Sequence, residues 1–199
     1  MSISSSISDL SVISDSSVNA AKRLQGLRLL FSRLFPERIS LDFTVVIATY
    51  NGEHRIGAVL ERLKRQIDVD NIAWEIIVVD NNSIDQTEAV VRGYQKQWPG
   101  TIPLRYEFEA KQGAGYARQR GTEVASSPLI GYLDDDNLPW LNWLRAAYRF
   151  GQQHPNIGVY GSRIRGKFST SPPAHVESIA AVLALTDRGP MPIPYDPAN

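Results

Sequence analysis

The sequence contains no cysteine among its 199 residues. It therefore has no disulfide framework and no zinc–thiolate site, and this absence fits a reducing compartment. Basic and acidic side chains are balanced at 21 each, so net charge gives no indication of a nucleic-acid partner. No run reaches the ~18–20 apolar residues of a membrane span, and the start lacks the pattern of a secretory signal. We therefore expect a cytoplasmic protein that does not bind nucleic acid.

Residues 1–40 differ in composition from the rest of the chain. Residues 1–17 are rich in serine, and we predict that they are disordered. Residues 18–35 carry only basic charges and place apolar side chains at helical spacing, namely Leu24, Leu27, Phe31 and Leu34. A basic amphipathic helix either lies on an anionic membrane, here the inner face of the plasma membrane, or packs on the domain. The sequence leaves both alternatives open.

Segments typical of strands and helices alternate over residues 41–199, which we predict to form one domain. Short apolar or alternating runs predict strands over 43–48, 75–79, 104–108, 129–133 and 157–161. Amphipathic or capped segments predict helices over 53–66, 85–98, 116–125, 139–153 and 176–186. The runs at 43–48, 75–79 and 129–133 lack polar alternation, which is typical of strands that are buried on both faces. The alternation predicts an α/β domain whose mostly parallel sheet is flanked by helices.

Three of the predicted strands end in polar clusters. These clusters are Thr49-Tyr50-Asn51, Asp80-Asn81-Asn82-Ser83 and Asp134-Asp135-Asp136. In parallel sheets ligands bind beyond the carboxyl ends of the strands. We therefore expect the three clusters to form one site.

The acidic triplet is the most informative of these clusters. Buried unpaired carboxylates are costly, so the acids are expected where the strand leaves the sheet. Strand geometry would place Asp134 and Asp136 on one side and Asp135 on the other. Carboxylate oxygens suit Mg²⁺ or Mn²⁺. The alternative is a solvated acidic turn that caps the next helix.

A divalent cation at these acids could bridge them to a nucleoside diphosphate. The two groups repel each other without it, and the cation would stabilise the departing diphosphate as its charge develops. Lys111 and Arg118 flank a glycine-rich turn and a helix start, where they could contact the anion.

Four motifs together resemble those of family 2 glycosyltransferases, in the same order and spacing, at residues 46–51, 78–85, 115–121 and 133–136. The resemblance covers about residues 43–165 and implies the GT-A fold, which is Rossmann-like, and inversion of anomeric configuration. Residues 136–139 and 172–173 are further similar to enzymes of hormogonium polysaccharide biosynthesis.

The resemblance also implies roles for individual residues. Thr49, Tyr50 and Asn51 would line the base pocket, and Asn81 would face the base edge beside Asp80. Asp134 and Asp135 would lie near ribose and diphosphate, and Asp136 would bind the metal. The family often has aspartate in place of Asn81, and asparagine in place of Gln119. The first departure leaves the nucleotide base open, although a UDP-sugar is the expected donor.

The expected function is metal-assisted, inverting transfer of a sugar from a nucleotide-diphosphate sugar to a polysaccharide or other glycan acceptor. The family's general base, commonly in a Glu-Asp pair, lies further along the chain, and nothing after Gly161 resembles that pair. We therefore expect the donor-binding half of a GT-A fold, incomplete at its C-terminus, with little or no transfer of its own. The alternative is a non-catalytic nucleotide-sugar-binding remnant or subunit.

Two other enzyme classes fit the sequence less well. A dinucleotide-binding oxidoreductase would need a glycine motif after the first strand, whereas Gly113 and Gly115 come after the third. A Mg²⁺-dependent phosphohydrolase would need an aspartyl nucleophile after the first strand, where Thr49 stands.

Overall fold

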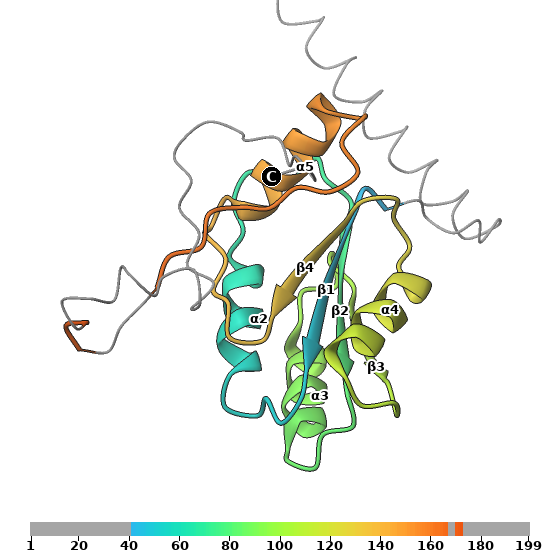
Figure 1. Ribbon diagram of the computed structural model, residues 1–199, viewed down its shortest axis with the longest axis vertical. Helices are drawn as coiled ribbons and strands as arrows, with labels where there is room; N and C mark the ends of the chain where they lie inside the picture. The colour runs from blue at the N-terminus through green and yellow to red at the C-terminus, as the bar shows by residue number, and fades with distance from the viewer. Residues whose placement is uncertain (1–40, 167–169, 173–199) are drawn as a thin grey trace, which may run out of the picture. The chain divides into compact units, whose positions relative to one another are not determined.

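The computed structural model describes residues 41–166 and 170–172. Its elements follow in the order β1 (Phe43–Thr49), α2 (Ile56–Lys64), β2 (Trp74–Asp80), α3 (Thr87–Gln97), β3 (Leu104–Phe108), α4 (Ala114–Val124), β4 (Ile130–Asp134) and α5 (Trp143–Gln153) (Figure 1). The four strands form a parallel sheet in the order β3-β2-β1-β4. The predicted α/β architecture, a parallel sheet flanked by helices, is confirmed.

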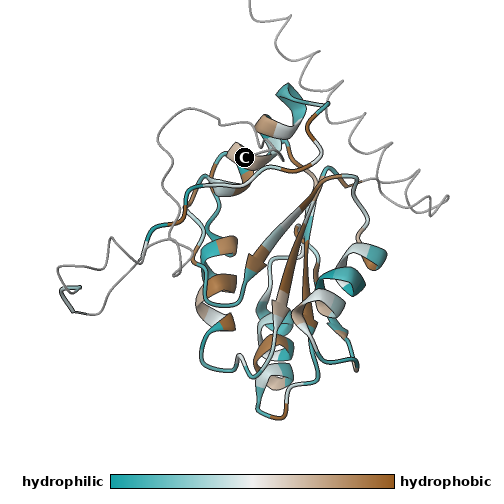
Figure 2. Cartoon of the chain, viewed as in Figure 1, coloured by the Kyte–Doolittle hydropathy of each residue, from teal (hydrophilic) through white to brown (hydrophobic). Residues whose placement is uncertain are grey.

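The two central strands are buried on both faces, which is why their sequences are nearly continuous apolar runs (Figure 2). Successive side chains of a strand point to opposite faces. Val45 and Ile47 belong to the larger core cluster, which also contains apolar residues of α2 and α3. Val46 belongs to a second cluster with Ala117 of α4. The sheet therefore lies between α2 and α3 on one face and α4 on the other.

Small residues let α4 approach the sheet closely. Ala117 and Gly121 are both buried and lie one helical turn apart. A Cβ atom on Gly121 would lie 2.3 Å from Cγ1 of Val46. Glycine at this position therefore allows the helix to contact β1 directly.

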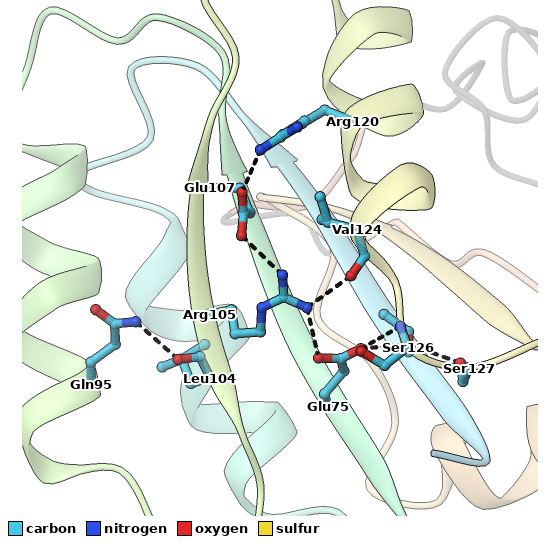
Figure 3. A network of polar contacts seen from close by, with 10 residues as sticks. Glu75, Gln95, Leu104, Arg105, Glu107, Arg120, Val124, Ser126 and Ser127 are labelled. Carbon is cyan, nitrogen blue, oxygen red and sulfur yellow. Dashed lines mark hydrogen bonds and ion pairs between the residues drawn. The ribbon is translucent and has the colours of Figure 1, made fainter. Parts of the chain in front are cut away.

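A network of charged side chains ties the face under α4 together (Figure 3). Glu75 of β2 is buried, accepts a hydrogen bond from the Ser126 backbone N–H at 2.8 Å, and pairs with Arg105 of β3 at 3.2 Å. Arg105 also contacts Glu107 at 3.0 Å, and Glu107 in turn binds Arg120 of α4 at 3.0 Å. The network satisfies a buried carboxylate, which would otherwise destabilise the fold.

Several predicted boundaries are wrong. Helix α2 begins at Ile56 instead of residue 53, because residues 53–55 form a turn. Helix α5 begins at Trp143, so Pro139 precedes the helix and does not open it. No strand forms over 157–161.

The strand before the acids is also less buried than predicted. Within the described residues β4 pairs only with β1. Tyr132, in the middle of β4, is 46% exposed. An apolar run predicts a strand, but it does not reveal whether the strand has neighbours on both sides.

The chain divides into two compact units, Met1–Tyr148 and Arg149–Asn199, with the boundary inside α5. In the second unit, Phe150 contacts the rings of His154 and Tyr160. No helix of the described segments has the length and apolar character needed to cross a bilayer. The predicted segments 1–17, 18–35 and 176–186, and the domain boundary at residue 40, lie outside the described residues.

Candidate functional site

The carboxyl ends of β1, β2 and β4 lie side by side at one edge of the sheet. Thr49 pairs in register with Asp80, and Ala48 pairs with Asp134. The backbone N–H of Asn81 continues this pairing by donating to the carbonyl of Thr49 at 2.8 Å. The three polar clusters that follow these strands are therefore neighbours, as the sequence predicts.

Two loops at this edge bind each other through side chains. The first loop is residues 50–55, after β1, and the second loop is residues 81–86, after β2. Asn51 donates its N–H to Ser83 Oγ at 2.9 Å, and its Oδ1 accepts from the N–H of Ile84 at 3.0 Å. Glu53 donates its N–H to Asp85 Oδ2 at 3.1 Å, and its carboxylate accepts from the N–H of Gln86 at 2.8 Å. The two loops are thus held as one unit.

Asp85 has the clearest electrostatic role in this unit. Burial raises the pKa of its carboxyl, but hydrogen bonds from the Thr87 hydroxyl and from the N–H groups of Glu53 and Thr87 outweigh burial and lower the pKa. Its charged form therefore stabilises the start of α3 and the contact between the loops. Asp85 accepts the N–H of Thr87 and Glu53 accepts the N–H of Gln86, so both carboxylates hold the start of α3.

The acidic turn, residues 134–136, has a buried middle member. Asp135 is 8% exposed and accepts hydrogen bonds from Thr49 Oγ1 at 2.6 Å and from Arg55 Nε and Nη2 at 3.0 and 2.9 Å. These hydrogen bonds to Asp135 are the main cause that raises the pKa of Arg55. Arg55 also donates to the carbonyl of Tyr50 at 3.1 Å. Arg55 thus joins the first loop to the acidic turn.

Arg55 is the main residue of this edge that the sequence analysis missed. It stands immediately before α2, and no motif or spacing in its neighbourhood marks it as a partner of the acids. Arg55 and its partner Asp135 lie 80 positions apart in the sequence.

The outer two acids of the turn are exposed and Asp135 is buried, so Asp135 lies on the opposite side from Asp134 and Asp136, as predicted, although the strand itself ends at Asp134. Asp134 forms an ion pair of 2.6 Å with Arg118 Nη2, and both side chains are about half exposed. The charge of Asp136 also acts on Arg55. The edge thus presents two carboxylates and a guanidinium to solvent.

Asp80 and Asn81, at the carboxyl end of β2, form their hydrogen bonds with other groups of the protein. Asp80 accepts from the Ser83 N–H at 2.9 Å and from the Tyr106 hydroxyl at 2.8 Å, and burial together with this carboxylate raises the pKa of Tyr106. Asn81 is 4% exposed. Its amide donates to the carbonyls of Glu109 and Lys111, and its Oδ1 accepts from the N–H of Gly113 at 2.6 Å.

Asn81 therefore holds the third loop, residues 109–113, against the sheet edge. The ammonium group of Lys111 in this loop lies 3.9 Å from the centre of the Tyr116 ring. The two residues line an open surface pocket of about 290 Å³ together with residues of α4. The ring of Tyr50, in the first loop, is 43% exposed.

The arrangement also indicates which side chains could bind a metal ion. Among the described residues no group of three or more histidine, cysteine or acidic side chains could hold a metal ion. Magnesium, however, is usually bound by one or two carboxylates together with water and substrate phosphates. Asp134 and Asp136 supply two exposed carboxylates, a donor set that fits a cation whose remaining ligands come from a bound diphosphate.

Residues 44–194 match the family described as "Glycosyl transferase family 2". This chain belongs to glycosyl transferase family 2. The match includes the described sheet and the acidic turn that carry the resemblance seen in the sequence.

The family 2 chain is similar to several proteins that are named as glycosyltransferases. It is 35% identical over 95 residues to "Validoxylamine A glucosyltransferase" of Streptomyces hygroscopicus subsp. limoneus, covering 46% of this chain and 19% of that protein. It is 28% identical over 115 residues to "Poly(ribitol-phosphate) beta-N-acetylglucosaminyltransferase TarS" of Staphylococcus aureus, covering 57% and 19%. The matched stretch is about a fifth of the length of each of these relatives.

The likeness extends to the fold. The crystal structure of S. aureus TarS in complex with UDP-GlcNAc superposes with a TM-score of 0.53 and 25% identity, covering 66% of this chain and 36% of that chain. The family 2 chain therefore has the GT-A, Rossmann-like glycosyltransferase fold in its described part.

Proposed function

We propose that this domain binds a nucleotide-diphosphate sugar at the carboxyl edge of its sheet and supplies the donor site for transfer of the sugar to a glycan acceptor. The observation that carries the proposal is the exposure of Asp134 and Asp136 at this edge, together with the ion pair between Asp134 and Arg118. The TarS structures in complex with UDP and with UDP-GlcNAc support the choice of a UDP-sugar as donor.

The first loop and the end of β2 would receive the nucleoside. The exposed ring of Tyr50 offers a face on which a base can stack. Asn81 has both amide N–H groups engaged, so only a lone pair of Oδ1 remains to accept a hydrogen bond from a base. Thr49, Asn51 and Asp80 act on the nucleoside indirectly, because their contacts hold the loops in place.

The acids and the cationic side chains would receive the diphosphate. Asp134 and Asp136 are the residues that would hold Mg²⁺ or Mn²⁺, and such an ion would stabilise the charge of the departing diphosphate. The guanidinium of Arg118 and the ammonium of Lys111 would bind phosphate oxygens. Asp135 is excluded from direct contact in this arrangement, because Arg55 and Thr49 already occupy its carboxylate.

Inversion at the sugar carbon needs a base within hydrogen-bond reach of the acceptor hydroxyl. We assign no general base to the described residues. The acceptor, the inverting outcome and the assistance of a metal therefore belong to the proposal and need their own measurements.

Nucleotide binding can be tested on the full 199-residue chain by calorimetry and thermal unfolding. UDP, GDP, ADP and CDP would each be added with and without Mn²⁺. A ligand that binds the folded state raises its melting temperature, so UDP with Mn²⁺ is expected to give the largest shift. The Asp136→Asn variant should lose most of this shift.

The matched control is Asp68→Asn. This exposed carboxylate pairs with Arg145 and lies at the other end of α2 from the first loop. Failure of all four nucleotides to bind, or an Asp136→Asn variant that binds as the parent does, would overturn the proposal. A transfer assay with a labelled UDP-sugar then separates donor binding from complete transfer.

A further inference from the structure

We propose that Arg118 is an exchangeable counter-ion. It neutralises Asp134 in the ligand-free protein, and it moves to the diphosphate when Asp134 binds a metal cation instead. The inference rests on the proposed donor site and deepens it. The carrying observation is the 2.6 Å contact between Arg118 Nη2 and Asp134 Oδ1 at the mouth of the site.

The two ion pairs of the acidic turn differ in a way that assigns them different roles. The Asp135 side chain is 12% exposed and is held by two nitrogens of Arg55 and by Thr49. The Asp134 side chain is 52% exposed, and a single nitrogen of Arg118 contacts it. Exposed ion pairs contribute little to stability, whereas buried ones are costly to break. The pair between Arg55 and Asp135 is therefore expected to persist when a ligand binds, whereas the pair between Arg118 and Asp134 can open.

Arg118 has the donors needed for the exchange. A guanidinium carries several N–H groups in a planar fork that matches phosphate oxygens. The contact with Asp134 uses one nitrogen, Nη2, so other N–H groups of the guanidinium remain to donate to a phosphate oxygen. Rotation of the Arg118 side chain is therefore expected to carry the guanidinium from Asp134 to a neighbouring phosphate oxygen.

The exchange predicts effects of opposite sign on two ligands. Arg118 competes with a cation for Asp134 and also repels it, so Arg118→Gln should bind Mn²⁺ alone roughly three- to tenfold more tightly. The same variant loses a phosphate contact, so its affinity for UDP at saturating Mn²⁺ should fall by about tenfold or more. Arg118→Lys keeps the charge but loses the fork, so its Mn²⁺ affinity should stay close to that of the parent.

Titration of Mn²⁺ without nucleotide, followed by electron paramagnetic resonance of the free ion, tests the first effect directly. The parent, Arg118→Gln, Asp134→Asn and the double variant would form a double-mutant cycle. The gain from Arg118→Gln should be much smaller in the Asp134→Asn background, because competition for the carboxylate is absent and only the repulsion between Arg118 and the cation remains. Arg145→Gln is the control, since it removes another 2.6 Å ion pair, with Asp68.

A measurement on the parent protein keeps the test independent of any variant's folding. The side-chain N–H resonance of Arg118 should shift when diamagnetic Mg²⁺ is added, as the guanidinium leaves Asp134. An unchanged resonance, or an Arg118→Gln variant that binds Mn²⁺ no more tightly, overturns the exchange while UDP binding by the parent leaves the proposed function intact. A parent that binds neither Mn²⁺ nor any nucleotide overturns both.

Discussion

Arg55 binds the carboxylate of Asp135 through two nitrogens, at 3.0 and 2.9 Å, across 80 positions of sequence. This contact occupies the middle acid of the acidic turn and joins the turn to the loop that follows β1. Asp134 and Asp136 are thereby the carboxylates that remain exposed at the edge of the sheet. The pair therefore determines which acids can meet a ligand, although neither of its members faces one in the proposed site.

Replacement of Arg55 by glutamine should destabilise the protein by about 1–3 kcal/mol, because it leaves a buried carboxylate with one hydrogen-bond partner fewer on each oxygen. Urea unfolding measures this change. Arg145→Gln breaks the exposed 2.6 Å pair with Asp68 and should cost less than about 1 kcal/mol. Equal losses in the two variants would show that the Arg55 pair has no special role.

Gly52 and Gly93 should respond to alanine with opposite signs. A Cβ atom on Gly52 would lie 2.1 Å from Thr49 Oγ1 and 2.6 Å from Asp135 Oδ2, so Gly52→Ala must displace these side chains and should destabilise by about 1–3 kcal/mol. Gly93 lies within α3 with nothing within 4 Å of its Cβ position. Gly93→Ala should therefore stabilise by about 0.5–1 kcal/mol. Thermal unfolding of both variants compares them, and a stable Gly52→Ala variant would contradict the close contact.

Asn81→Asp would replace the amide by the residue that the family often carries, yet it should destabilise this protein. An aspartate cannot donate to the carbonyls of Glu109 and Lys111, so two partly buried hydrogen bonds are lost, at a cost of about 1–3 kcal/mol. The backbone amide of Gly113, in the third loop, should exchange its hydrogen faster in the variant than in the parent. The exposed neighbour Asn82, at φ 64°, should tolerate aspartate with little change. Unaltered exchange in Asn81→Asp would exclude the clamp.

The loop contact made by Asp85 should depend on pH. Its pKa in the folded protein lies below the ordinary value of 3.8, so the folded state favours the carboxylate. The stabilisation is present above about pH 3.8 and is lost as the pH falls through the lower folded pKa. The free energy of unfolding of the parent should therefore approach that of Asp85→Asn as the pH falls. A difference that stays constant from pH 6 to about pH 3 would be inconsistent with this linkage.

Most elements of the fold could be predicted from local pattern. The apolar runs at 43–48 and 75–79 correspond to β1 and β2, because strands covered on both faces carry no polar alternation. The errors occur where local pattern has no information about neighbours. Pro139 resembles a helix start but precedes α5 by four residues, and 157–161 forms no strand despite its composition.

Some features of the candidate site could likewise be predicted from local sequence pattern. Alternation in the strand was enough to predict that Asp134 and Asp136 lie on one side and Asp135 on the other, but not which of the two sides is exposed. The family could be recognised because its motifs are short, local and ordered along the chain. These properties follow from sequence because each depends on residues close to one another in the chain.

The partners of the acids depend instead on the folded chain. Arg55 reaches Asp135 only because β1 and β4 are neighbours in the sheet and glycine at position 52 lets the first loop close over the turn. Arg118 meets Asp134 because α4 packs against β1, the strand that pairs with β4, on the face of the sheet opposite α2 and α3. Contacts of this kind are made between segments that are distant in sequence, so no local pattern encodes them.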